Sequence, residues 1–223
     1  MANKIDLVYK YFEKREDVEN RKLSKLILSI KTAVQFLQCV DKIFIVTDKH
    51  LVQHFEDIIN EKVLTIDYLT LIPSMYLPTF NSETTESYLH YIPNLSEYFL
   101  FNRKYFLFTG PICYSDLITT SNKFNISNTP MLDTSQSEQS RYQKRLNYTI
   151  NLLKKSMYII EDKNFINNDN LIILRKNTLR TIEIIFSEEL HRMRLSKITT
   201  ATMVQYMFLA TNLDHLLKKN IIL

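Results

Sequence analysis

The sequence contains a single glycine, Gly110, among its 223 residues, whereas glycine usually makes up about 7% of a protein. Loops that bind a phosphate with their backbone generally need glycines, because only glycine lets the ligand approach the chain closely. Gly110 stands alone before Pro111. The composition therefore argues against a glycine-rich phosphate-binding loop.

Cysteines and long apolar runs are also scarce. The two cysteines, Cys39 and Cys113, lie in apolar sequence surroundings, which is typical of buried thiols in a reducing compartment, and the sequence leaves a disulfide between them open. No apolar run approaches the ~20 residues needed to span a bilayer. The N-terminal MANKIDLVYKYF lacks the apolar stretch and cleavage site of a signal peptide. We therefore expect a cytoplasmic protein without a membrane span.

The excess of positive charge is small, at +4, and lies below the level at which nucleic-acid binding becomes the first hypothesis. A surplus of Asn, Ile, Lys and Tyr indicates an AT-rich genome, such as those of some viruses and bacteria. A chain of this length can bury a sizeable core. We expect one α/β domain over residues 1–223, with a sheet-forming part at 1–121 and a mostly helical part at 141–223.

Short β-branched and apolar runs alternate with helical patterns in the first half of the chain. The runs predict strands at 4–9, 42–47, 63–68 and 98–101. An amphipathic helix is expected over 19–37, where apolar residues recur at helical spacing. Strand and helix in alternation predict a mainly parallel sheet with flanking helices and right-handed crossovers.

The most informative stretch runs from Leu77 to Phe106 and reads LPTFNSETTESYLHYIPNLSEYFLFNRKYF. A proline-bounded loop ends at Ser82, which we expect to cap a helix running to about Tyr91 by accepting hydrogen bonds from its first amides. An apolar strand then ends at the polar residues Asn102, Arg103 and Lys104. Chemistry in α/β folds usually lies at such strand ends.

LPTFNS, the ES..LH.IP.LSE run and a strand ending in Phe-Asn together resemble the second conserved region of the Stealth family. The resemblance implies a nucleotide-sugar transferase-like fold, Rossmann-like or GT-A-like, and hexose-1-phosphoryl transfer. Family members include bacterial capsular polysaccharide polymerases and the animal enzyme that adds N-acetylglucosamine-1-phosphate to lysosomal glycans. VDKIFIVTD, ending at Asp48, also resembles the family's sequence, and residues 172–217 more weakly resemble its third conserved region.

The chain departs from the family at its polar site. The family pattern at the strand end is Asn-Asp-Asp, and the aspartate pair there would hold a divalent ion and serve catalysis. This chain has Asn102-Arg103-Lys104, which changes the charge of the pair from −2 to +2 and repels a cation. In the first conserved region Asp6 is retained, while Tyr11, Glu13 and Lys14 replace the family's Trp, Asp and Gly. We therefore expect no metal site, no cofactor and a degenerate catalytic site.

The matching positions outline a vestigial cleft, for which the sequence predicts Asp6, Tyr11, Glu13, Asp48, Asn81, Ser82 and Glu86. Asp6 either binds a ligand or bonds to nearby amides as a structural residue, and the sequence leaves both open. Asn81, Ser82 and Glu86 are expected to act structurally. A second set of residues forms a possible anion site, in which the cations either bind an anion or pair with Asp6 and Asp48: Lys10, Lys14, Arg103 and Lys104.

Other polar groups have ordinary explanations. His50 and His54 are spaced to share a metal on a helix, but no third ligand follows, so we expect surface histidines. The helix expected over 141–158 carries a basic face, which is either solvated or meets an anionic partner. That face is formed by Arg141, Lys144, Arg145, Lys154 and Lys155.

Three functions remain open. The first is an inactive Stealth-like domain re-used as a protein-binding or structural subunit. The second is an active hexose-1-phosphoryl transferase in which Arg103 and Lys104 neutralise the phosphates of a nucleotide-sugar donor. The third is a nucleic-acid-associated accessory protein. Loss of the Asp pair with retention of the packing residues favours the first, with another protein as the expected partner.

Overall fold

The computed structural model describes residues 4–12, 16–118, 129–130, 141–157, 166–167 and 171–218. These residues cluster into two compact units. One, the sheet unit, consists of 1–70, 93–126 and 169–173. The other, the helical unit, consists of 71–92, 127–168 and 174–223. Glu13 and Lys14, which the sequence places in the cleft, lie outside the described residues.

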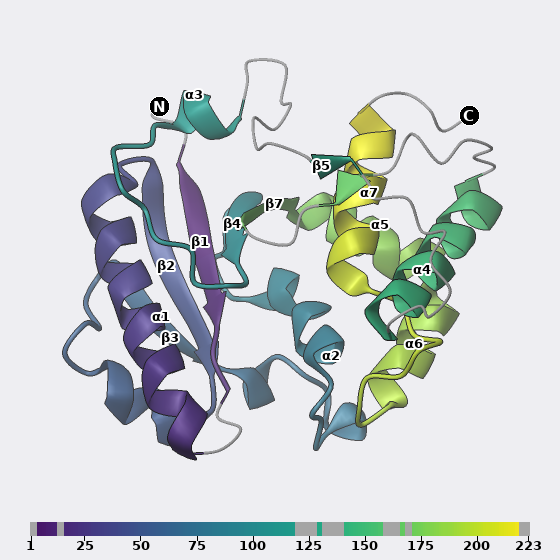
Figure 1. Ribbon diagram of the computed structural model, residues 1–223, viewed down its shortest axis with the longest axis horizontal. Coiled ribbons are helices and arrows are strands. Elements are labelled where there is room, and N and C mark those ends of the chain that lie inside the picture. Colours follow the sequence, from purple (N-terminus) through teal and green to yellow (C-terminus); the bar gives the residue numbers. More distant parts are fainter. Residues whose placement is uncertain are drawn as a thin grey trace. The chain divides into compact units, whose positions relative to one another are not determined.

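A five-stranded sheet in the order β3-β2-β1-β4-β7 forms the centre of the sheet unit (Figure 1). Its strands are β1 (Ile5–Lys10), β2 (Val40–Thr47), β3 (Val63–Asp67), β4 (Tyr98–Asn102) and β7 (Leu171–Arg175). β1 pairs in parallel with β2 and β4, and β2 pairs in parallel with β3. The predicted mainly parallel sheet with flanking helices is therefore confirmed, with all four predicted strands in place.

Helix α1 (Glu16–Phe36) covers one face of the sheet (Figure 1). Its residues Leu26, Ile30 and Ala33 are almost fully buried and join a core with Leu7 and Ile43 from the strands. The spacing of four and three residues places these side chains on one stripe of the helix. This stripe explains the periodicity that predicted the helix from the sequence.

Short helices connect the strands of the sheet unit. They are η1 (Lys49–Phe55), η2 (Tyr68–Thr70) and α3 (Tyr114–Leu117). His50 and His54 are exposed on η1, which is a 3₁₀ helix. Both cysteines are free, and Cys113 is exposed whereas Cys39 is buried. The expectation of two buried thiols is therefore wrong for Cys113, which lies at the exposed start of α3.

The helical unit is built around α7 (Tyr206–Lys218), which packs against α4 (Arg141–Met157) and α5 (Lys176–Ile185). It also contains η3 (Ser74–Tyr76), α2 (Ser82–Glu86), η4 (Leu89–Tyr91), α6 (Ser187–Leu195) and the antiparallel pair β5 (Thr129–Pro130) and β6 (Ile166–Asn167). The single helix predicted from 83 to 91 is instead α2 followed by η4. None of the described helices is long and apolar enough to cross a membrane.

Candidate functional site

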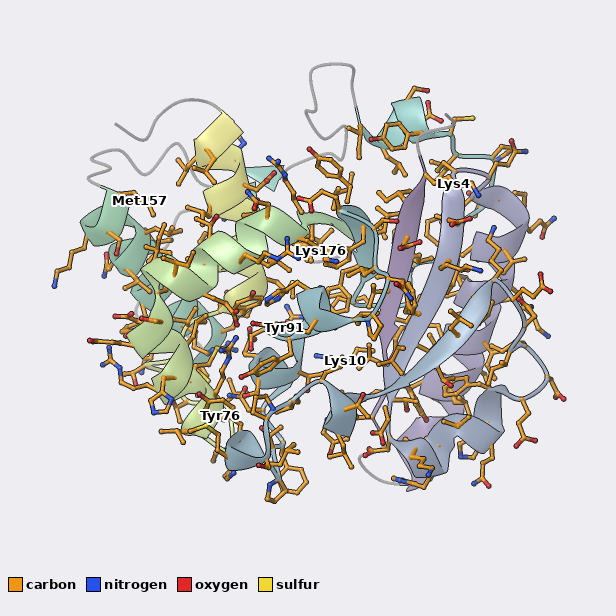
Figure 2. The ribbon with its side chains drawn as sticks, turned by 180° about the vertical axis from the view of Figure 1, so that it is seen from behind. Lys4, Lys10, Tyr76, Tyr91, Met157 and Lys176 are labelled. Atoms are coloured by element: carbon orange, nitrogen blue, oxygen red, sulfur yellow. The ribbon has the colours of Figure 1, made fainter. Side chains whose placement is uncertain are left out.

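The carboxyl ends of the parallel strands bring several sequence-predicted residues to one edge of the sheet. Residues Lys10, Asp48 and Arg103 each lie at the end of a strand or directly after it. Tyr11 continues from β1 and donates its amide to the carbonyl of Val46 at 2.9 Å. Lys4, directly before β1, and Lys10, its last residue, lie at opposite ends of the strand (Figure 2). The Lys10 end is therefore the edge at which the family's chemistry is expected.

Asn102 at this edge is fully buried and makes local hydrogen bonds. Its Oδ1 accepts from the Phe106 amide at 2.7 Å, and its Nδ2 donates to the Phe106 carbonyl at 3.0 Å and to Ser29 Oγ at 3.2 Å. Ser29 Oγ also lies 2.9 Å from the buried Tyr9 hydroxyl, whose pKa is raised by burial. Asn102 thus closes the turn that carries Arg103 and Lys104.

The turn itself presents basic side chains. Arg103 is half-buried and Lys104 is exposed. Tyr105 follows with a left-handed φ of 55° and donates its hydroxyl to the Lys10 carbonyl at 2.8 Å. The turn is therefore fixed on both sides, by Asn102 and by Tyr105.

Acidic groups at the same edge belong to the neighbouring strands. Asp48 precedes η1 without capping it through its side chain. The pKa of the Tyr68 phenol is raised, chiefly by burial and further by the nearby charges of Asp48 and Asp67. Among the residues that the structure describes, no three His, Cys, Asp or Glu side chains are grouped so as to share a metal ion.

Asp6 lies elsewhere than a shared cleft with Arg103 would require. Asp6 pairs in register with Phe99, four residues before Arg103, so it lies roughly 13 Å back along the sheet at about 3.3 Å per residue. It is buried, and its carboxylate accepts from the amides of Lys42 and Ser96. Tyr11 is also buried, edge-on to Phe55. The expected pairing of Asp6 with the basic turn is therefore wrong, because Asp6 stands near the amino end of β1.

The helix cap in the motif is Asn81 and not Ser82. Asn81 Oδ1 accepts from the Glu83 amide at 3.2 Å, while its Nδ2 donates to the Met193 carbonyl at 2.9 Å. Ser82 is already the first residue of α2 and donates its hydroxyl to Glu86 Oε1 at 2.9 Å. The expected cap by Ser82 is off by one position, because α2 begins one residue earlier than the pattern predicts.

This shift leads to a stability prediction. Replacing Asn81 with alanine should lower the free energy of unfolding by about 1–2 kcal/mol, because the buried cap and the bond to Met193 are lost. Ser82→Ala should cost clearly less, since it removes the hydroxyl that bonds to Glu86 and no cap. Urea denaturation of both variants measures the difference. Equal losses, or a larger loss for Ser82→Ala, would contradict this assignment of the cap.

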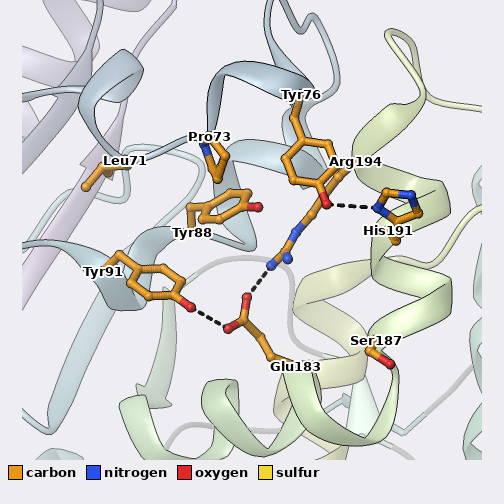
Figure 3. A pocket seen from close by; sticks show the side chains of 9 residues that line it. All are labelled: Leu71, Pro73, Tyr76, Tyr88, Tyr91, Glu183, Ser187, His191 and Arg194. Atoms are coloured by element: carbon orange, nitrogen blue, oxygen red, sulfur yellow. Dashed lines mark hydrogen bonds and ion pairs between the residues drawn. The ribbon is translucent and has the colours of Figure 1, made fainter.

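The helical unit contains a pocket of about 650 Å³ (Figure 3). We call it the tyrosine pocket. Its lining residues are Leu71, Pro73, Tyr76, Tyr88, Tyr91, Glu183, Ser187, His191 and Arg194. The loop before α2, the helix η4 and the helices α5 and α6 therefore all contribute to it.

Arg194 and Glu183 form the polar centre of the tyrosine pocket (Figure 3). Arg194 Nη2 donates to Glu183 Oε1 at 2.5 Å, and the guanidinium lies 4.1 Å from the centre of the Tyr88 ring. Tyr91 donates its hydroxyl to Glu183 Oε2 at 2.6 Å. Burial raises the pKa of Glu183, but hydrogen bonds from His90, Tyr91 and Arg194 outweigh burial and lower it to about 2. Glu183 is therefore ionised at neutral pH.

A second ion pair lies deeper in the helical unit. Arg145 Nη2 is 2.7 Å from Glu83 Oε1, and both side chains are buried. Glu83 Oε2 also accepts from the Tyr206 amide at 2.7 Å. The sequence predicts Arg145 on a basic face of α4, and this is wrong because Arg145 is buried. Arg141 and Lys144 of that face are exposed.

Sequence reasoning missed the tyrosine pocket. One signal was available: Glu183, Ser187, His191 and Arg194 follow one another at intervals of four, four and three residues, which places polar groups on one helical stripe. The aromatic wall from 76 to 91 could not be joined to that stripe from spacing alone, because the two segments lie about a hundred residues apart.

Comparison with known proteins finds partial matches to a Stealth family model and to capsular polysaccharide phosphotransferases. Residues 19–126 match the model of Stealth protein CR2, conserved region 2. The chain is 38% identical over 78 residues to the capsular polysaccharide phosphotransferase cps1A of Actinobacillus pleuropneumoniae, which covers 35% of this chain and 21% of that protein. It is 38% identical over 90 residues to the capsular polysaccharide phosphotransferase fcs1 of Haemophilus influenzae, covering 40% and 24%.

The matched segments thus span about a quarter or less of these two curated relatives. Among solved structures, the mannosyltransferase Ktr4p from S. cerevisiae aligns with a TM-score of 0.49 and 12% identity, over 87% of this chain and 61% of that one.

Proposed function

We propose that this chain, which belongs to the Stealth family, is a sugar-phosphate transferase-like domain that has lost catalysis and acts as a protein-binding or structural subunit. The observation that carries the proposal is the turn after β4. Arg103 and Lys104 occupy the positions of the family's aspartate pair. The side chain of Asn102 bonds to the backbone of Phe106 and so closes that turn.

The charge of the turn supports the loss of catalysis. Phosphoryl transfer needs positive charge on the phosphates, which enzymes commonly supply with a divalent ion held by carboxylates. Two cationic side chains at that position repel such an ion. The buried Asp6, bonded to two amides, retains a structural use that needs no ligand. Residues with packing or hydrogen-bonding roles are therefore the ones that persist.

Exposed apolar side chains on the helical unit support a protein partner. The segments 74–80 and 195–198 lie side by side, since the Phe80 amide donates to the Lys197 carbonyl and Lys197 Nζ donates to the Leu77 carbonyl. The large apolar residues exposed on them are Met75, Phe80, Leu195 and Ile198. Phe80 leaves 78% of its surface exposed, and clustered exposure of this kind often marks an interaction site.

Calorimetry with magnesium or manganese and a panel of nucleotide sugars tests the loss of catalysis. We expect no metal-dependent binding to the native chain. Replacing both Arg103→Asp and Lys104→Asp should allow metal binding to appear, because the restored carboxylates supply ligands at the turn. A Stealth protein that retains Asn-Asp-Asp serves as the positive control. Micromolar, metal-dependent binding of a nucleotide sugar by the native chain would contradict the loss of catalysis and support an active transferase.

The protein-binding role is tested by affinity purification from the native source with matched variants. A partner recovered with the wild-type chain should be lost with Phe80→Asp. Leu28→Asp introduces the same charge at an exposed apolar residue of α1 and should retain it. Recovery of the same proteins with both variants would argue against the exposed segments at 74–80 and 195–198.

A further inference from the structure

We propose that Cys39 and Cys113 form a reversible redox site, at which a small disulfide such as oxidised glutathione converts the two free thiols into an intrachain disulfide. Both cysteines belong to the sheet unit and both are free. Neither lies in the turn after β4 or in the exposed segments at 74–80 and 195–198. The redox site is therefore independent of the function proposed above.

Backbone contacts bring the two cysteines together although they lie far apart in the sequence. The Ile112 amide donates to the Phe36 carbonyl at 3.0 Å, and Ile112 forms an isolated parallel bridge with Leu37. Cys39 follows Leu37 by two residues, and Cys113 directly follows Ile112. The bridge thus holds the backbone of both cysteines in one place.

The Cys39 sulfur points at the backbone of Cys113. Cys39 Sγ donates to the Ile112 carbonyl at 3.6 Å, and this carbonyl belongs to the peptide bond that leads into Cys113. Standard peptide geometry then places the sulfur within about 6.5 Å of the Cys113 Cα. Disulfides usually link residues whose Cα atoms lie about 4.4–6.8 Å apart. Rotation of the side chains with a small backbone shift is therefore enough to join the two sulfurs.

The two thiols differ in their access to an oxidant. Cys113 is exposed, whereas Cys39 leaves only 9% of its surface exposed. Burial, and further the nearby charges of Cys113 and Asp116, raise the pKa of Cys39. Because the thiolate is the attacking species and must reach its target, an oxidant in solution meets Cys113 first.

The reaction then proceeds by two exchanges. The Cys113 thiolate attacks one sulfur of oxidised glutathione, so that a mixed disulfide forms and one glutathione thiolate leaves. Cys39 loses its proton to the solvent and attacks the Cys113 sulfur, which releases the second glutathione. Two protein thiols are oxidised, and one glutathione disulfide is reduced to two thiols. An excess of reduced glutathione reverses both steps.

The product joins the turn before β2 covalently to the start of α3. In the reduced chain this contact includes the hydrogen bond from Ile112 to Phe36 and the weak one from the Cys39 thiol. The Cys113 backbone is held from the other side, since its amide donates to Asp116 Oδ2 at 2.7 Å. Oxidation therefore fastens a contact that the fold has already made.

Intact mass spectrometry of the full chain, incubated with excess oxidised glutathione and quenched with acid, tests the proposal. The wild-type chain should lose the mass of two hydrogen atoms and retain no glutathione, and its digest should contain one peptide pair linked through Cys39 and Cys113. Cys39→Ala should stop at the mixed disulfide and carry one glutathione on Cys113. Cys113→Ala should stay unmodified over the same time, because the remaining thiol is buried.

A measurement on the wild-type chain alone guards against variants that fail to fold. In urea the yield of the intrachain disulfide should fall at least about tenfold, because the two cysteines are then separated by a long flexible loop. An equal yield in urea would contradict the proposal. So would a glutathione that stays on the folded wild-type chain, dimers linked through Cys113 in place of the intrachain disulfide, or modification of folded Cys113→Ala as fast as of the wild type.

Discussion

Replacing Arg145 with methionine is expected to lower the free energy of unfolding by about 3–5 kcal/mol. Methionine fills a similar space but leaves the Glu83 carboxylate, which is 1% exposed, buried without the guanidinium that lies 2.7 Å away. Arg145 also donates to the Val204 carbonyl at 3.1 Å. Equilibrium urea denaturation at neutral pH measures the loss.

Lys144→Met provides the matched control, because it makes the same type of change one residue earlier on the exposed face of α4. It should alter stability by no more than about 0.5 kcal/mol. The double variant Glu83→Gln, Arg145→Met should recover part of the loss, since the stranded charge is then gone. Equal effects of Arg145→Met and Lys144→Met would show that the pair contributes little.

Arg145 also shows where periodicity fails as a guide to charge. The apolar periodicity of residues 141–158 correctly predicts a helix. It also predicts that every basic residue off the apolar face is exposed, which is wrong for Arg145. Arg145 is buried because Glu83 lies across from it in the folded unit, 62 positions away in the sequence. A partner at that distance leaves no trace in local spacing. The exposed basic residues of α4 are therefore fewer than the sequence indicates.

The sheet was predictable and the rest of the fold less so. β1, β2, β3 and β4 are buried runs bounded by polar residues, which gives a strong local signal. β7, reading LIILR, falls in the part of the chain that the sequence predicts to be mostly helical, because a short apolar run does not distinguish a strand from a buried helix segment. The helix expected from 83 to 91 was also wrong in its extent, since it ends at Glu86 before η4.

The candidate site was predictable in its location and not in the use of its residues. The motif correctly placed Asn102 and Arg103 at the end of a parallel strand. It could not show that the Asn102 side chain bonds to the Phe106 backbone, because that contact depends on the turn geometry. Nor could it separate Asp6 from the cleft, because the level of a residue in the sheet depends on register, which only the paired strands define.

Asp6 is the residue whose role the sequence leaves open, and replacing it with alanine is expected to lower the free energy of unfolding by about 3 kcal/mol or more. Its carboxylate accepts from the Ser96 amide at 2.6 Å and from the Lys42 amide at 3.0 Å. Lys42 lies where β2 carries an extra residue opposite β1, between Val40 and Ile43. One side chain thus ties the starts of three strands, and hydrogen bonds to a charged group contribute about 1.5–3 kcal/mol each.

Asp41→Ala is the control for this prediction, because Asp41 pairs with Lys4 in an exposed ion pair of the kind that contributes at most about 1 kcal/mol. Thermal and urea unfolding of the two variants should therefore separate clearly. A ligand-binding role predicts the reverse pattern for Asp6: unchanged stability, together with the loss of a measurable affinity. Because both carboxylate oxygens accept from backbone amides, an Asp6→Ala variant of unchanged stability would contradict the structural role and favour a binding role for Asp6.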